Sequence, residues 1–288
     1  MINQGFLQIT VFRYFSVITL LLIACFLSGC SNLSTFLFYP QKHYYQYPEQ
    51  LGLNAERVNI KTKDGETLVN WFLKSPIETK GTILFLHGNG ENISTHINSV
   101  AWLPKYGYEV FLLDYRGYGE SSGTSTLASA FQDIDDAHRW LSARQESSPL
   151  FVLGQSMGGA LAITYTAQYD KNLNKIAALI AESAPASWPQ VAREAMSKSW
   201  VTWLLQIPVS LIPSEYDAQD HIANIKATPI LLMHSKQDPV VAYHHSQQLF
   251  ERGQGRAQWI ETEGGHIGGF NEALIREKFL DFLEANGV

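Results

Sequence analysis

The sequence predicts an α/β protein with a mostly parallel, eight-stranded sheet flanked by helices. Two observations predict this class: short apolar runs alternate with helical patterns along most of the chain, and several of these runs are apolar throughout. A continuous apolar run is typical of a strand that is buried on both faces, as in a parallel sheet. The 288 residues are 45% hydrophobic and 17% charged, which suits one large globular domain.

The first two strands are expected at 57–60 and 67–73, where apolar and polar residues alternate on either side of a turn at 63–65. This alternation predicts an antiparallel pair. Further strands are expected, joined by right-handed crossovers, at 81–87, 108–114, 150–154, 176–182, 229–234 and 257–261. The gaps between the runs predict helices at 92–104, 126–144, 157–168, 240–252 and 270–285.

One gap is too long for a simple crossover. No strand fits between Ala184 and Ile225. This segment instead contains two short apolar or amphipathic pieces, WPQVAREAM and SWVTWLLQIPVSLIP. We expect a short helical cap insertion, about 184–225, over the carboxyl edge of the sheet, where ligands bind in such folds. The apolar piece at 199–213 fits three roles: packing on the sheet edge, lining an acyl pocket, or touching a bilayer.

The first 29 residues have the pattern of an export signal. An apolar run from Tyr14 to Leu27 follows Arg13, and it is shorter than the roughly 20 residues of a membrane span. It ends in Leu27-Ser28-Gly29-Cys30, which resembles the lipobox of bacterial lipoproteins. The resemblance implies cleavage before Cys30 and lipid on its thiol. An uncleaved anchor helix is the alternative.

This leader sets the expected domain organisation and location. Residues 1–29 are a lipoprotein signal peptide, 30–55 a tether and lead-in, and 56–288 the folded domain. We expect a lipid-anchored protein on the exported side of a bacterial membrane, with Ser31 favouring the outer membrane. The two cysteines, Cys25 and Cys30, lie in or at the end of the leader, so the domain is expected to fold without a disulfide. The net charge of −6 and the lack of a basic run argue against nucleic acid as a partner. A monomer is expected.

A serine stands among glycines where a strand is expected to become a helix. The apolar run 150–153 leads into Gly154-Gln155-Ser156-Met157-Gly158, and a helical pattern follows. On a sharp strand-to-helix turn, side chains two positions before and two positions after the serine would collide, so both become glycine. The pattern therefore predicts an exposed nucleophile at Ser156, held against the helix N-terminus. An ordinary glycine-rich turn is the alternative.

A serine hydroxyl needs a base, here a histidine supported by an acid. His266 is the candidate base, because it follows the last expected strand on the glycine-rich loop EGGHIGGF. The acid is expected between serine and histidine in chain order. Asp238 lies just after a strand and is the candidate, whereas Asp217 and Asp220, inside the insertion, are its rivals.

The oxyanion of an acyl-transfer reaction needs backbone donors that are already in place. One expected donor is the N–H of Met157, directly after the nucleophile. The loop FLHGNGEN follows a buried strand and offers the second, with the N–H of Asn89 as first choice and that of Gly90 as second. This loop lacks the Lys-Ser/Thr of a phosphate-binding loop, and no cluster has zinc-site spacing. We therefore expect neither a cofactor nor a metal.

Taken together, the motifs resemble the α/β-hydrolase fold serine hydrolases over roughly residues 56–286. The likeness rests, in the family's order, on LFLHGNGEN, LLDYRGYGES, GQSMGG, SKQDPVV and GGHIGG. It is strongest to a branch described as esterases, lysophospholipases or acyl-protein thioesterases. The resemblance implies a catalytic triad of Ser156, Asp238 and His266, and a structural role for DYRGYG. The family often has His-Gly at the strand end before the acid, whereas this chain has His234-Ser235.

The expected function is therefore hydrolysis of a small-molecule or lipid acyl ester, or of a thioester, through an acyl-serine intermediate. A peptidase or amidase on the same fold is an alternative, because ester and amide cleavage share the tetrahedral intermediate. A third reading, from another class, is an inactive lipoprotein that binds a lipid or a partner. The complete set of triad residues and glycines in the sequence favours an enzyme.

Overall fold

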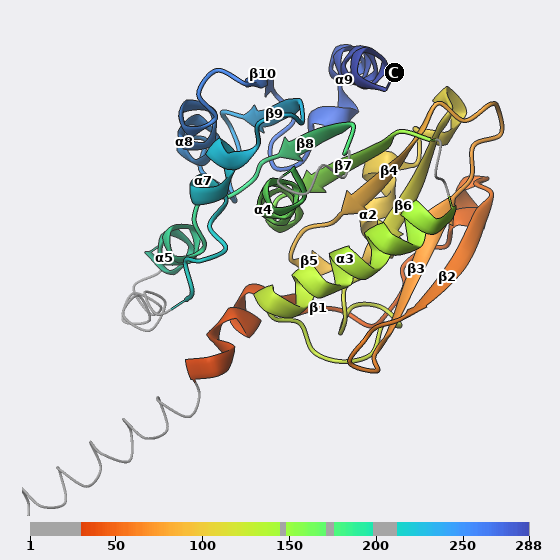
Figure 1. Ribbon diagram of the computed structural model, residues 1–288, viewed down its shortest axis with the longest axis horizontal. Coiled ribbons are helices and arrows are strands. Elements are labelled where there is room, and N and C mark those ends of the chain that lie inside the picture. Colours follow the sequence, from red (N-terminus) through yellow and green to blue (C-terminus); the bar gives the residue numbers. More distant parts are fainter. Residues whose placement is uncertain (1–29, 145–147, 171–175, 198–211, 288) are drawn as a thin grey trace, which may run out of the picture.

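The structure is a computed structural model that describes residues 30–144, 148–170, 176–197 and 212–287. Its main feature is an eight-stranded sheet in the order β10-β9-β8-β7-β4-β6-β3-β2 (Figure 1). All eight expected strands are confirmed, as β2 (Ala55–Lys61), β3 (Thr67–Leu73), β4 (Gly81–Leu86), β6 (Tyr108–Leu113), β7 (Leu150–Gln155), β8 (Ala178–Glu182), β9 (Ile230–Ser235) and β10 (Ala257–Thr262). The pairs β2–β3 and β3–β6 are antiparallel, and the other pairs are parallel.

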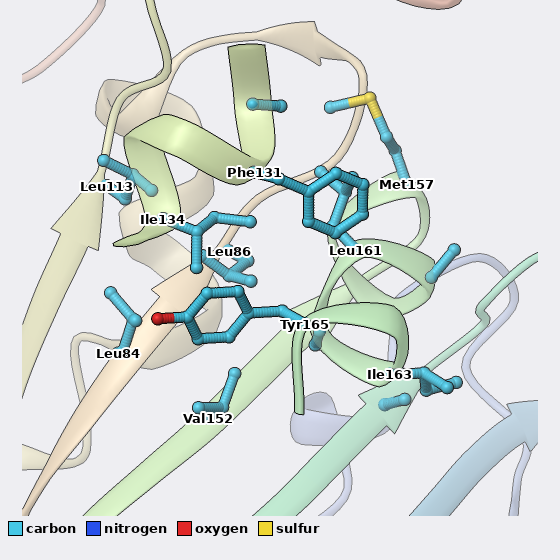
Figure 2. Close-up of a cluster of buried hydrophobic side chains, with 14 of the residues drawn as sticks. Leu84, Leu86, Leu113, Phe131, Ile134, Val152, Met157, Leu161, Ile163 and Tyr165 are labelled. Atoms are coloured by element: carbon cyan, nitrogen blue, oxygen red, sulfur yellow. The ribbon is translucent and has the colours of Figure 1, made fainter. Parts of the chain in front are cut away.

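Helices cover both faces of this sheet (Figure 1). The expected helices are present as α2 (Ile93–Val100), α3 (Leu127–Arg144), α4 (Met157–Asp170), α8 (His244–Arg252) and α9 (Ala273–Asn286). One apolar cluster joins the sheet to α3 and α4 and includes Phe131, Met157 and Leu161 (Figure 2). A second cluster joins the opposite face to α2 and α9. The two clusters give the sheet a buried row of side chains on each face, which explains its continuous apolar strands.

The expected insertion is helical where the structure describes it. It contains α5 (Trp188–Ser197), the short α7 (Ala218–His221) and the 3-10 turn η5 (Ile222–Asn224). Trp188 is buried, and its indole N–H donates to the carbonyl of Tyr216 over 2.9 Å. The apolar piece predicted at 199–213 lies mainly in 198–211, outside the described residues.

The segment expected as a lead-in packs onto the domain from Ser34 onward. It forms η1 (Cys30–Leu37), β1 (Tyr39–Pro40) and η2 (Pro48–Leu51), and β1 pairs in parallel with β5 (Gly90–Glu91). Phe38 and Tyr44 are buried, and the side-chain amide of Asn92 donates to two carbonyls of the segment. The export signal lies outside the described residues. No helix in the described ranges is long and apolar enough to cross a bilayer.

Candidate active site

Ser156 occupies a strained turn between β7 and α4. Its φ is +54°, in the left-handed region that residues with a side chain rarely adopt. Its backbone N–H donates over 2.8 Å to the carbonyl of Glu182, at the end of the neighbouring strand β8. Backbone strain of this kind persists only where the surrounding structure enforces it, and it is common at functional sites. The turn therefore has the geometry of a nucleophile turn at the carboxyl edge of the sheet.

The glycines on either side of Ser156 leave room for neighbouring backbone. A Cβ on Gly154 would overlap the carbonyl oxygen of Gly158, and a Cβ on Gly158 would overlap that of Leu86 at the end of β4. The first turn of α4 therefore packs directly on its own strand and on β4. The collision predicted from the sequence is confirmed, and it involves backbone atoms.

His266 and Asp238 form a directly bonded pair. The Nδ1–H of His266 donates to Oδ2 of Asp238 over 2.8 Å, and the carboxylate is buried while the imidazole is 17% exposed. The other oxygen of Asp238 accepts from the backbone N–H groups of Val240 and Val241. Burial opposes ionisation, but hydrogen bonds from His234, His266 and Val240, with the charge of His266, hold the pKa of Asp238 well below its usual range. The arrangement leaves Nε2 of His266 as the atom that can take up a proton.

The loop that carries His266 is closed by two glycines. A Cβ on Gly268 would overlap the carbonyl of Gly264, and Ile267 between them has a φ of +49°. The 3-10 turn η6 (Gly269–Asn271) follows at once. The imidazole is therefore presented from a tight loop, which limits its freedom to move away from Asp238.

The nucleophile and the base come from neighbouring parts of the same sheet edge, but they are not bonded to each other. Within the residues that the structure describes, Ser156 and His266 share no hydrogen bond. Their turns are joined through Glu182, which accepts from the backbone N–H of Ser156 and from that of Gly269. Catalytic hydrogen bonds are often long in unliganded sites and tighten when substrate binds.

One expected oxyanion donor, the N–H of Met157, directly follows the nucleophile at the start of α4. Met157 is the first residue of α4, so its N–H has no acceptor within the helix. A Cβ on Gly88 would lie 3.5 Å from Cβ of Ser156, which places the loop after β4 against the turn. The carbonyl of Gly88 accepts from Nδ1 of His87 over 2.7 Å. In a trans peptide the N–H of Asn89 then points away from His87, and the choice between Asn89 and Gly90 as the second donor stays a prediction.

A buried histidine, His87, and a partly buried one, His96, lie against the loop that follows β4. His87 is fully buried, with Nε2 3.2 Å from Oδ1 of Asp114, and the ring of His96 stacks on it at 5.1 Å. Burial raises the pKa of Asp114, against the hydrogen bond and charge of His87. Burial, together with the charge of His87, lowers the pKa of His96 to about 3, so His96 is neutral and its Nε2–H donates to the carbonyl of Gly90. Sequence reasoning missed His96, whose only signal is its place in the helix after the loop.

His234 is a second residue near the triad that sequence reasoning assigned to the core. It is fully buried, its Nε2 lies 3.2 Å from Oδ2 of Asp238, and its Nδ1 accepts from the hydroxyl of Ser246 over 2.6 Å. The same oxygen of Asp238 is therefore contacted by two imidazoles, those of His234 and His266. The sequence signal was the histidine at the end of the strand before the acid.

The rival acids have other partners. Asp217 accepts from the backbone N–H of Trp188 over 2.8 Å, and Asp220 forms an exposed ion pair with Arg252 at 3.2 Å. Both contacts join parts of the insertion to each other or to α8. The structure therefore brings Asp238, and neither rival, to His266.

Among the described residues, one group of side chains has ligands suited to a metal: Glu194 of α5 with His244 and His245 of α8. Nδ1 of His245 accepts from the backbone N–H of Ala186 over 3.1 Å, so the proton of the neutral ring is on Nε2. That Nε2–H donates to Glu194 over 3.1 Å and has no lone pair to offer a metal. The group is therefore best described as a hydrogen-bonded contact between the insertion and α8.

Comparisons with known proteins indicate the family of this chain. The sequence model of the family Hydrolase_4, described as serine aminopeptidase S33, matches residues 77–217. The uncharacterized protein YfhR of Escherichia coli K12 is 32% identical over 258 residues, covering 86% of each chain. The α/β-hydrolase domain-containing protein WAV2 of Arabidopsis thaliana is 31% identical over 227 residues, covering 75% of this chain and 72% of that one.

Solved structures share the fold. An esterase of Pyrococcus furiosus superposes with a TM-score of 0.69 at 21% identity, over 88% of this chain and 98% of that one. The esterase domain of a Rhodothermus marinus protein superposes with a TM-score of 0.61 at 19% identity, over 81% and 98%. With these relatives and this fold, the chain belongs to the α/β-hydrolase family.

Proposed function

We propose that this hydrolase is a serine esterase that cleaves acyl esters or thioesters through an acyl-serine intermediate. The observation that carries the proposal is the His266–Asp238 bond of 2.8 Å, at the sheet edge where Ser156 occupies a strained turn. A histidine oriented by an acid, near a serine on such a turn, is the arrangement that activates a hydroxyl at neutral pH. No cofactor or metal is part of the proposal.

The proposed reaction has two halves. Oγ of Ser156 attacks the carbonyl carbon while Nε2 of His266 takes the hydroxyl proton, and Asp238 stabilises the resulting imidazolium. The N–H groups of Met157 and Asn89 stabilise the negative oxygen of the tetrahedral intermediate. His266 then gives its proton to the leaving alcohol or thiol. Water, activated by the same imidazole, releases the acid from Ser156.

The matched family model is described as a serine aminopeptidase, so cleavage of amides is the second candidate. The solved structures named as esterases share the fold of this chain, and they support the proposal that it cleaves esters. The test compares p-nitrophenyl acetate, butyrate, octanoate and palmitate with amino-acid p-nitroanilides, using Ser156→Ala as the blank. We expect ester turnover that requires Ser156. Faster anilide turnover would favour the peptidase, and no turnover of either class would favour an inactive binding protein.

The same panel tests the acyl chain. An apolar acyl pocket should raise kcat/KM by up to roughly fourfold for each added methylene until it is full, since each buried CH₂ is worth about 0.8 kcal/mol. A steady fall from acetate to palmitate would contradict a lipid-like acyl substrate and leave a small-ester hydrolase.

We also propose that the enzyme acts at a bacterial membrane, with the outer membrane favoured, anchored through lipid on Cys30. The support is the sequence Leu27-Ser28-Gly29-Cys30 at the end of an apolar run. Labelling with a radioactive fatty acid should mark the wild-type protein, and Cys30→Ser should remove the label and leave the precursor uncleaved. Equal labelling of the variant would contradict the anchor while leaving the esterase proposal intact.

A further inference from the structure

We propose that Glu182, the last residue of β8, is a positioning residue that joins the nucleophile turn to the histidine loop and places a second negative charge beside His266. The inference rests on the function proposed above and adds a residue that no catalytic motif of the sequence contains. Glu182 is 1% exposed. It lies between the strand that carries the nucleophile and the strand that precedes the acid.

The first set of contacts is with the nucleophile turn. Gln155 and Glu182 are direct partners in the parallel pairing of β7 and β8, so their side chains lie on the same face of the sheet. The amide nitrogen of Gln155 donates to Oε2 of Glu182 over 2.6 Å, and the backbone N–H of Ser156 donates to its carbonyl over 2.8 Å. Both side chain and backbone of Glu182 therefore hold the turn.

The second contact is with the loop that presents the base. The backbone N–H of Gly269, three residues after His266, donates to Oε1 of Glu182 over 2.8 Å. A Cβ on Gly269 would lie 2.8 Å from the same oxygen, so glycine lets this loop approach the carboxylate closely. The two oxygens of one side chain thus connect the two loops that must be aligned for proton transfer.

These contacts favour the ionised carboxylate. Both oxygens accept from N–H donors, and such hydrogen bonds are stronger to the ionised carboxylate than to the protonated acid. Burial raises the pKa of Glu182, while the hydrogen bonds of Gln155 and Gly269 and the charges of His266 and His234 oppose that rise. No Lys or Arg among the described residues forms an ion pair with this carboxylate. When Glu182 is ionised, its charge therefore acts on the histidines without being neutralised by a cation.

Several other titratable groups surround His266. Asp238 orients the ring through Nδ1, His234 is bonded to that same acid, and His96 of α2 is neutral because its pKa is about 3. Glu182 and Asp238 are two negative groups that interact with the imidazole, and Glu263 and Glu272, whose side chain accepts from the N–H of Glu263, lie on the same loop as His266. When His266 takes the serine proton, the charge of Glu182 stabilises the imidazolium, as opposite charges nearby favour the charged form.

Glu182→Gln separates charge from position. No described residue bonds to Oε1 of Gln155, so after a flip of its amide Gln155 can accept from the new amide N–H₂. The remaining oxygen at position 182 still accepts from Gly269. The variant therefore keeps both connections and loses the charge. Glu109→Gln is the matched control, because Glu109 is a buried carboxylate near the opposite end of the parallel strands, 3.5 Å from Lys74.

The readout is kcat/KM for p-nitrophenyl butyrate from pH 5 to 9, with melting temperatures for each variant. We expect Glu182→Gln to lower the plateau by roughly tenfold and to move the acid limb to lower pH by about half a unit or more. Glu109→Gln should leave the limb where it is. An unchanged profile in Glu182→Gln, or a lower plateau with an unmoved limb, would overturn the proposal by showing a structural role at most.

A second variant covers the case in which Glu182→Gln does not fold. Gln155→Met removes one donor from the carboxylate, which makes Glu182 easier to protonate. A protonated Glu182 has lost its charge, so the acid limb should move to lower pH, in the same direction as in Glu182→Gln. An unmoved limb in this variant would overturn the proposal. If turnover in the wild type depends on Ser156, either failure refutes only the role of Glu182. Turnover that does not need Ser156 refutes the proposed function and the role of Glu182 together.

Discussion

Among the histidine–aspartate contacts that the structure describes, those of His87 with Asp114 and of His266 with Asp238 both lie at the carboxyl edge of the sheet, and they differ in the exposure of the imidazole. In the pair of His87 and Asp114 the imidazole is fully buried, with one nitrogen on the carbonyl of Gly88 and the other 3.2 Å from the acid. In the pair of His266 and Asp238 one nitrogen is bonded to the acid at 2.8 Å and the ring is 17% exposed. The imidazole of His266 therefore has a partly exposed face from which Nε2 can take a substrate proton, whereas both nitrogens of His87 are buried.

The pKa values of the two acids, Asp114 and Asp238, are shifted in opposite directions. Burial raises the pKa of Asp114, whereas hydrogen bonds and the histidine charge outweigh burial and lower the pKa of Asp238. An acid that stays ionised can stabilise an imidazolium during turnover. A His–Asp contact alone therefore does not identify a catalytic base. An accessible imidazole nitrogen and several hydrogen-bond donors to the acid are the additional features that favour His266.

The largest expected effect comes from placing the same substitution in both pairs. The amide of asparagine can replace an Nδ1–H donor but cannot act as a base. His266→Asn should therefore lower kcat by on the order of 10⁴ or more, whereas His87→Asn can still donate to the carbonyl of Gly88 and should lose within about tenfold. Ester turnover with melting curves checks both. Equal losses would show that the pairs are not distinct in the way described.

The next largest effects are expected from replacing the two acids, Asp238 and Asp114, with asparagine. Asp238→Asn should lower kcat by roughly 10³–10⁴, because the amide no longer stabilises the imidazolium. Asp114→Asn should act mainly on stability and lower the free energy of unfolding by about 1–3 kcal/mol, since Asp114 accepts from the N–H of Ile93 and faces His87. Turnover and urea unfolding measure the two effects. A large loss of turnover in Asp114→Asn at full folding would give the buried pair a catalytic role.

A substitution at Tyr118 tests the proposed role of Asn89 and the loop after β4 in stabilising the oxyanion. Its hydroxyl donates to the carbonyl of Asn89 over 2.6 Å, and the N–H of Tyr39 donates to the same oxygen over 2.8 Å. Tyr118→Phe removes one of these two donors and should lower kcat by about three- to tenfold with little change in KM, because the loop acts on the transition state. A change confined to KM would place this loop in substrate binding instead.

The smallest effect concerns pH and stability. Burial lowers the pKa of His96 to about 3 and that of His138 to about 4, so both are neutral when folded. The unfolded chain takes up these protons below about pH 6.5, and the free energy of unfolding therefore falls as the pH drops from 6.5 toward those values. His96→Gln should reduce this slope by up to about 1 kcal/mol per pH unit, measured by urea unfolding at pH 6.5, 5.5 and 4.5. His138→Gln, in α3 on the opposite face of the sheet, should act similarly without changing turnover. A slope unchanged in both variants would contradict neutral histidines in the fold.

The parts predicted from the sequence are those with a local signal. Each strand is a short apolar run, and the glycines beside Ser156 mark a local collision that the structure confirms. Residues whose role depends on distant partners were missed: Glu182 ends an apolar strand like any other, and its partners Gln155 and Gly269 lie 27 and 87 positions away. The packing of the lead-in segment was also missed, because it depends on contacts with distant residues, such as the hydrogen bond of Tyr39 to Asn89 and that of Asn92 to Gln41.

Fluorophosphonates react with activated serine hydroxyls, so labelling with one, followed by mass spectrometry of the peptides, tests whether Ser156 is the nucleophile. If Ser156 is the activated nucleophile, we expect one adduct, on the peptide that contains Ser156. We also expect labelling to be lost or greatly slowed in His266→Asn and kept near the wild-type rate in His87→Asn. No adduct on folded protein, an adduct on another serine, or equal loss in the two histidine variants would contradict the account.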